Sequence, residues 1–192
     1  MKVWLMIGCL LVVATSAQAK FREVTILSIA GGSYQIDDSQ HHLVGSRTAI
    51  GVKHLLDENW SWFASLGTGA AQQKYLAADQ SHYWLEAKTT SFTGGGEYRF
   101  SLDKKGAVVP FLGVGLNSLK YELDYTYPGS QVGKVQGTGF GPMVKLGSRF
   151  RFGRNFILIP AYQYSSVSIK REDGSTQSLV SSGLFIGLVA SF

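Results

Sequence analysis

The segment that decides the fold is residues 140–152, FGPMVKLGSRFRF. Every second residue from Phe140 to Phe152 is apolar or small, and none of these seven is charged. The residues between them are glycine, methionine, lysine or arginine. A period of two is typical of a β-strand, whose side chains point alternately to the two faces of a sheet. The segment therefore predicts a strand with one uncharged, mostly apolar face and one small or cationic face.

The same alternation recurs along the chain, and sustained helical spacing of apolar residues is absent after residue 19. Short or turn-like connections at 56–59, 101–106 and 153–155 are expected to alternate with longer polar connections at 76–82 and 126–138. The glycines at 94–96 are a candidate β-bulge, where the facing of the residues would switch. The eight predicted strand segments are about 24–36, 43–55, 60–75, 83–100, 107–125, 139–152, 156–171 and 179–192.

Residues 1–19 have the pattern of a cleaved export signal. Lys2 precedes an apolar stretch at 3–14, and Ala17-Gln18-Ala19 offers a small-x-small cleavage site. The apolar stretch is shorter than the roughly 20 residues that a membrane-spanning helix needs. Residues 20–192 contain no cysteine and no run of 18 apolar residues. The chain is therefore predicted to be an exported protein whose single domain comprises residues 20–192.

The composition and the two faces together predict a barrel in lipid. Charged residues make up only 16% of the 192 residues, against 12% aromatic residues and 23 glycines, which excludes a disordered chain. A closed barrel pairs every backbone group, as lipid requires, and glycines on the inner face leave room for long charged side chains. The fold class expected is all-β: an eight-stranded antiparallel transmembrane β-barrel of up-and-down topology. A soluble secreted barrel or sandwich is the alternative.

The chain resembles the small eight-stranded bacterial outer-membrane barrels, such as the OmpA transmembrane domain, OmpX/Ail and the opacity-type porins. The resemblance rests on the export signal, the eight-segment rhythm, the stretch from Pro110 to Gly115 and the apolar alternation that ends at Phe192. It implies a monomer in the outer membrane of a Gram-negative bacterium, with no cofactor. It also implies that Leu188, Ala190 and Phe192 form the signal presented to the barrel-assembly machinery.

Charged residues on the predicted inner face form a candidate network in the lumen. Glu86 is the expected counter-ion, with Glu97 or Glu122 as further candidates. Eight strands leave an interior just wide enough for side chains to fill, which favours a plugged lumen. A narrow cation-lined path for small anions is the alternative. The predicted network comprises Arg47, Lys53, Glu86, Lys88, Lys145, Arg149 and Arg151.

A second basic set lies near the predicted outward ends of the strands: Lys74, Lys120, Lys134, Lys170 and Arg171. These residues are candidates for contact with lipopolysaccharide phosphates, with ordinary solubility charge as the alternative because acidic residues are interspersed. Nucleic acid is excluded as a partner, since the chain is exported and its basic residues form no patch.

The sequence gives little support for a catalytic site or a metal site. A barrel that deacylates lipid A would be expected to carry a His-x-Ser pair, which none of the four histidines supplies. His41, His42 and His82 lack the acidic or cysteine spacing of a metal site. No catalytic residue and no metal are therefore predicted. The expected role is structural or interactive at the cell surface, through loop contacts to lipopolysaccharide, host surfaces or neighbouring cells. The alternatives are a narrow pore for small solutes or anions and a lipid A-modifying enzyme.

Overall fold

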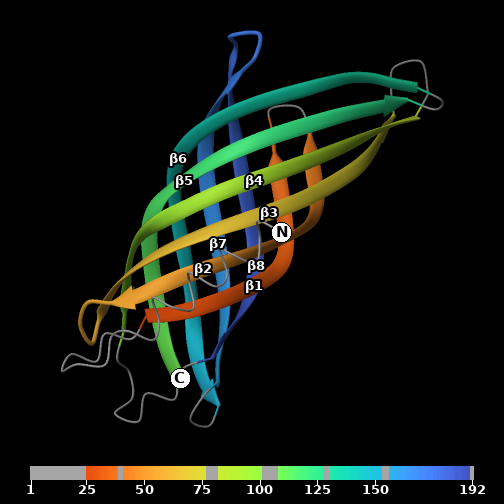
Figure 1. Ribbon diagram of the computed structural model, residues 1–192. Coiled ribbons are helices and arrows are strands. Elements are labelled where there is room, and N and C mark those ends of the chain that lie inside the picture. Colours follow the sequence, from red (N-terminus) through yellow and green to blue (C-terminus); the bar gives the residue numbers. More distant parts are fainter. Residues whose placement is uncertain are drawn as a thin grey trace, which may run out of the picture.

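The computed structural model describes residues 25–38, 41–76, 82–100, 108–127, 130–152 and 156–190. They form a closed barrel in which each strand pairs antiparallel with its neighbours in sequence and β1 pairs with β8 (Figure 1). The eight-stranded antiparallel barrel expected from the sequence is confirmed. The strands are β1 (Thr25–Asp37), β2 (His42–Leu55), β3 (Trp60–Leu76), β4 (His82–Arg99), β5 (Val108–Tyr127), β6 (Ser130–Phe152), β7 (Phe156–Arg171) and β8 (Thr176–Ala190).

Two of the sequence-based predictions concern the ends of the chain. The proposed export signal, residues 1–19, and Phe192 of the proposed assembly signal lie outside the described residues. Leu188 of that signal lies on the outer face of β8. Among the described residues, no helix is long and apolar enough to cross a membrane.

The predicted long polar connection at 126–138 is wrong. β5 continues to Tyr127 and β6 already begins at Ser130, so most of this stretch is strand. Lys134 pairs with Asp124 and Val135 with Leu123 across the two strands, which extends the hairpin. The polar character that indicated a loop instead reflects an outer face that meets water, as the side chains below show.

The strands differ in length, and the barrel is therefore uneven at one end. β3 pairs with β4 out to Leu76 and His82, whereas the pairing of β2 with β3 ends at Val44 and Gln72. Figure 1 shows the β3–β4 and β5–β6 hairpins reaching past the ends of β1 and β2, toward the upper right of the view. We call the half of the barrel next to the 56–59 turn the proximal half, and the half that ends in these long hairpins the distal half. The boundary between the halves lies near Thr90 in β4 and between Asn117 and Ser118 in β5.

The interior holds two apolar clusters and a set of buried polar side chains. The distal cluster includes Ile36, Leu43, Leu85, Leu119 and Leu123, all of which are essentially inaccessible to solvent. A smaller proximal cluster contains Ile26, Phe111, Ile159, Ala161 and Val189. The buried polar side chains include Arg47, Thr93, Glu97, Asn117, Arg149, Ser165 and Ser181.

Candidate functional site

The outer face of the proximal half is an apolar belt. In β5, Leu112, Val114 and Leu116 are each at least 41% exposed on this face. The belt runs from Val108 to Leu116, and at the rise and tilt usual for barrel strands it is about 21 Å tall, close to the apolar band of membrane barrels. Other members are Leu27, Ile29, Ile50, Leu66, Phe92, Val144, Leu146, Leu184, Ile186 and Leu188.

Aromatic side chains border this belt at the end with the short turn. Trp60 and Tyr98 are in edge contact, with their ring centroids 5.0 Å apart, and Tyr98 contacts Phe100 in the same way at 5.1 Å. Trp62 stacks on the ring of His54 at 5.6 Å. Aromatic residues prefer the interface between the lipid and the water, where one end of the ring is apolar and the other wet. The belt and its aromatic border identify the proximal half as the part that spans a membrane.

Inside the proximal half, a single carboxylate holds two cations. Lys53 Nζ from β2 lies 2.5 Å from both carboxylate oxygens of Glu97 in β4. Arg149 Nη2 from β6 approaches Glu97 Oε1 to 3.4 Å. All three side chains are less than 10% exposed, and Glu97 is fully buried. Burial of this kind demands pairing, because an isolated charge in a protein interior loses several kcal/mol of hydration.

A third interior cation, Arg47, rests on aromatic rings. Its guanidinium lies near the rings of Tyr34 and Phe185, 5.7 and 5.6 Å from their centroids. It also donates to Ser91 Oγ at 2.5 Å. A Cβ atom at Gly67 would come within 2.8 Å of Arg47 Nε, so the absence of a side chain there makes room for the guanidinium. The expectation that inward glycines accommodate long charged side chains applies at this position.

Lys145 is the fourth interior cation. Its Nζ atom lies 5.5 Å from the ring centroid of Phe63 and 5.6 Å from that of Phe111. Within the part of the chain that the structure describes, Lys145 forms no ion pair. Attraction between a cation and the faces of two rings offsets part of its desolvation, but it supplies no negative charge.

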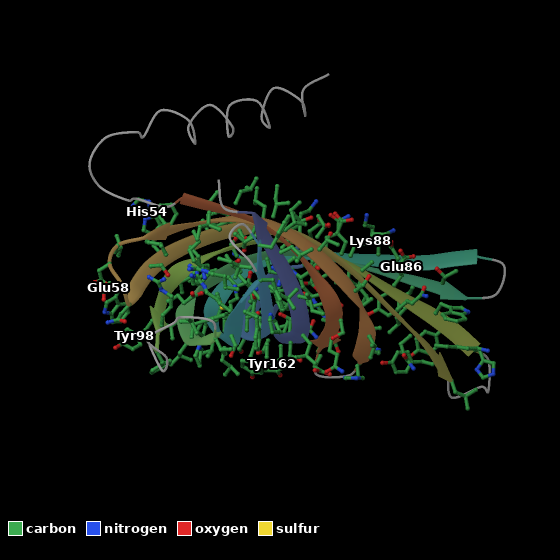
Figure 2. All side chains as sticks on the ribbon, turned by 90° about the horizontal axis from the view of Figure 1, so that it is seen from below. His54, Glu58, Glu86, Lys88, Tyr98 and Tyr162 are labelled. Atoms are coloured by element: carbon green, nitrogen blue, oxygen red, sulfur yellow. The ribbon has the colours of Figure 1, made fainter. Side chains whose placement is uncertain are left out.

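The predicted interior positions of Glu86 and Lys88 are wrong. Both side chains lie on the outer face of β4, where they form an ion pair at 3.1 Å. Figure 2 shows them together at the end of the barrel opposite Glu58 and Tyr98. The side chains of Glu86 and Lys88 point outward because the register of β4 continues unbroken through the three glycines at 94–96, where no bulge occurs. Because the odd residues from Leu85 to Glu97 point inward, the even residues must point outward.

Arg151, the remaining member of the predicted network, is exposed near the proximal end of β6 and does not join the interior cluster. Glu97, which sequence reasoning ranked below Glu86, is the counter-ion that the structure brings to Lys53 and Arg149. The signal that identifies it is the parity of β4. Counting by twos from the apolar Leu85 leads to Glu97 only if the glycine run contains no bulge.

The outer face of the distal half carries many charged side chains, several of them in ion pairs. Lys120 and Lys134 both pair with Glu122, at 2.8 and 3.1 Å. Lys88 lies 3.9 Å from Asp124 as well as close to Glu86. Among the predicted lipopolysaccharide contacts, Lys74, Lys120, Lys134 and Lys170 are exposed on this face.

Arg171 differs from those four lysines. It is only partly exposed, and its guanidinium donates to the side-chain oxygen of Gln177 on the neighbouring strand β8. In strand β7, the odd residues Val167 and Ile169 are buried and the even residue Lys170 is exposed, so Arg171 shares the parity of the inner face. Its position therefore does not fit the prediction that it contacts lipid phosphates.

The first two histidines are engaged with neighbouring carboxylates. His41 Nδ1 lies 3.2 Å from Asp38 Oδ1, and His42 Nδ1 contacts the carboxylate of Asp37. The hydroxyl of Tyr75 donates to the carbonyl oxygen of His42 at 2.7 Å. Among the described residues, no group of three potential ligands is placed to hold a metal ion.

The comparisons with known proteins agree with the fold. No protein-family model matches the chain, and no curated protein sequence matches it. Neisserial surface protein A is similar over 88% of this chain and 97% of its own, with 16% identity and a TM-score of 0.59. The attachment invasion locus protein Ail of Yersinia pestis covers 90% of this chain and matches over its whole length, with 14% identity and a TM-score of 0.58.

The outer membrane protein OprG from Pseudomonas aeruginosa is similar at 12% identity and a TM-score of 0.62, over 88% of this chain and 97% of its own. Each of these structures is a small barrel of outer-membrane type, as the sequence resemblance implied. The predicted transmembrane β-barrel is therefore confirmed, both by its fold and by its apolar belt.

Proposed function

We propose that this protein is a closed surface barrel of the outer membrane of a Gram-negative bacterium, and that it contacts its surroundings through its distal half. The observation that carries the proposal is the reversal of the side-chain pattern between the two halves. The distal half has an apolar interior and a charged exterior, which is the arrangement of a protein in water. In membrane barrels the short turns face the periplasm, so the distal half projects from the cell.

Lipopolysaccharide is the partner that we propose for the outer face of this half. The lysines begin just beyond the upper edge of the apolar belt, at the level where lipid phosphates are expected. Lys74 and Lys170 form no ion pair with any other described residue, whereas Lys120 and Lys134 share Glu122. The two lysines without a paired carboxylate are therefore the better candidates to bind phosphate, since their charge is not already compensated.

The test is binding of purified lipopolysaccharide to the folded barrel in a zwitterionic detergent. Replacing Lys74 and Lys170 together by serine should weaken binding and reduce its dependence on salt. Arg151→Ser removes one exposed positive charge at the proximal end and serves as the matched control, for which unchanged binding is expected. Equal binding by all three proteins would refute the proposed contact, and the heat-modifiable shift of the folded band on a gel checks that each variant has folded.

A narrow anion path is the second candidate, and the four interior cations favour it. The distal apolar cluster opposes it, because Leu85, Leu119 and Leu123 fill the barrel above the cations. Conductance across a planar bilayer distinguishes the two functions. The closed barrel should give no stable current steps, whereas steady anion-selective steps would favour the pore and refute the closed lumen.

A further inference from the structure

A small cavity lies inside the proximal half, beside the ion network. Its volume is about 30 Å³. Three of its eight lining residues are cations, namely Lys53, Lys145 and Arg149. The remaining lining residues are Ser28 and four aliphatic side chains, Ile26, Ile157, Ile159 and Val189. The cavity is thus lined by both cationic and aliphatic side chains.

The charges around this cavity do not balance. Among the described residues, four cations lie in the interior, Arg47, Lys53, Lys145 and Arg149, and the buried carboxylate that pairs with any of them is Glu97. Glu97 lies close to Lys53 and Arg149, and it does not line the cavity. Burial of uncompensated charge is unfavourable by several kcal/mol for each ion. An anion bound near these cations would therefore stabilise the folded barrel.

The unsatisfied hydrogen-bond donors of Arg149 also indicate that a ligand binds here. Its side chain is 9% exposed, yet among the described residues Nε and Nη2 find no hydrogen-bond partner, although Nη2 lies within ion-pair distance of Glu97. Buried donors in native proteins nearly always have a partner, in the protein or in a bound molecule. Lys145, on the same wall, lies over aromatic faces. These groups line a space that one small hydrogen-bond acceptor would fill.

We propose that this cavity binds a single monovalent inorganic anion of the halide class, with chloride as the physiological occupant. The size of the cavity favours a small ion, because about 10–15 Å³ admits one water molecule and the cavity has about 30 Å³. A halide is a single atom and fits this space. Water would satisfy the donors of Arg149 but would leave the excess positive charge in place. A halide does both.

The site would make folding depend on the anion present, since a ligand that binds only the folded state stabilises it. The measurement is the temperature at which the folded, heat-modifiable band is lost, in a zwitterionic detergent at constant sodium concentration. Chloride replaces gluconate stepwise, because gluconate is too large for the cavity. The midpoint for the unsubstituted protein should rise with chloride and level off at saturation. An identical midpoint in gluconate and chloride would overturn the proposal.

Two variants make the test specific to the cavity. Lys145→Met keeps most of the length of the side chain and removes its charge, so the chloride-dependent rise should be lost or strongly reduced. Arg47→Met also removes an interior cation, but one that does not line the cavity, and its chloride-dependent rise should persist. If both variants lose the rise equally, the effect comes from general interior charge and the site assignment is wrong.

Direct placement of the ion is the second measurement. Crystals of the folded barrel grown in sodium bromide should show an anomalous peak between Lys53, Lys145 and Arg149. The Lys145→Met crystals should lack it. A cavity that contains only water in bromide crystals of the unsubstituted protein would refute the proposal even if chloride raises the midpoint.

Discussion

The two halves of β5 carry opposite patterns on one continuous strand. In the proximal half, Val114 and Leu116 face outward, while Asn117 faces inward. A few residues later, Lys120 is exposed outside and Leu119 is buried inside. The backbone alternation does not change between the halves, so the medium outside the barrel decides which parity is apolar. The reversal therefore marks the upper edge of the membrane within the sequence itself.

The strongest test of this comparison uses two glutamates that each contact two cations. Glu97→Gln leaves Lys53 and Arg149 buried without their carboxylate, and it should lower the free energy of unfolding by about 3–5 kcal/mol. Glu122→Gln removes the matching carboxylate from Lys120 and Lys134 on the water-exposed outer face, where little change is expected. Reversible urea unfolding of the barrel in lipid vesicles measures both. Similar losses for the two variants would contradict the assignment of these residues to interior and exterior.

The distal core gives the next largest effect. Leu123 is completely buried in it, and Leu123→Ala should cost about 2–5 kcal/mol, as large-to-small substitutions in well-packed cores do. Hydrogen exchange should show lost protection for distal amides near Leu85 and Leu119, with the belt amides less affected. Lys120→Ala, at an exposed position of the same strand, is the control and should leave exchange nearly unchanged. Uniform loss of protection over the whole barrel would mean that the two halves do not open separately.

The outer surface allows a test of where the lipid ends. Leu146 is 51% exposed near the middle of the belt, and Leu146→Arg should destabilise the inserted barrel by about 2–4 kcal/mol. Ser168→Arg places the same charge on the outer face of the distal half and should be tolerated. The folded fraction after insertion into vesicles, followed by the heat-modifiable gel shift, compares the two. Equal tolerance would place the membrane boundary elsewhere.

The sequence predicts the fold well because alternation is a local property that the backbone preserves. The facing of residues 140–152 and the interior positions of Arg47 and Lys53 follow from period two alone. The limits of the belt do not follow from it. Residues 126–138 look like a loop if one assumes that an outer face is apolar throughout, whereas in water the outer face of a strand is polar.

The charge network shows a second limit. Sequence alone does not tell whether the glycines at 94–96 continue the register or shift it by one residue, and one shift exchanges Glu86 for Glu97 as the interior acid. The backbone decides between them through pairing on both sides of β4, because Gly95 pairs with Phe63 of β3 and Gly115 of β5 without interruption. That information is spread over three strands, and no single segment contains it.

The smallest expected effect concerns two turns at opposite ends of the barrel. In each of them, an aspartate side chain accepts hydrogen bonds from residues that follow it in the turn. Asp57 accepts the backbone N–H groups of Asn59 and Trp60, both at 2.7 Å, at the proximal end. Asp173 accepts the hydroxyl and the N–H of Ser175, at 2.6 and 2.8 Å, in the β7–β8 turn. The hydrogen bond from Trp60, followed by that from Asn59, lowers the pKa of Asp57 below its ordinary value of 3.8, and the hydroxyl and then the N–H of Ser175 lower the pKa of Asp173.

Because its folded-state pKa is lowered, each ionised carboxylate stabilises the barrel at pH values above the ordinary pKa of aspartate. This contribution is lost as the pH falls through the folded-state pKa. Asp57→Asn and Asp173→Asn should therefore each cause a small loss of stability at neutral pH that disappears in strong acid. Glu58→Gln, a carboxylate beside Asp57 that accepts no backbone hydrogen bond from the described residues, should cause less change and is the control. If the barrel unfolds as one unit, both aspartate variants will lower the stability measured for that single unfolding transition. If the halves open separately, Asp173→Asn will affect only the exchange of distal amides, and the reversal of pattern along the strands then also marks a boundary between two cooperative units.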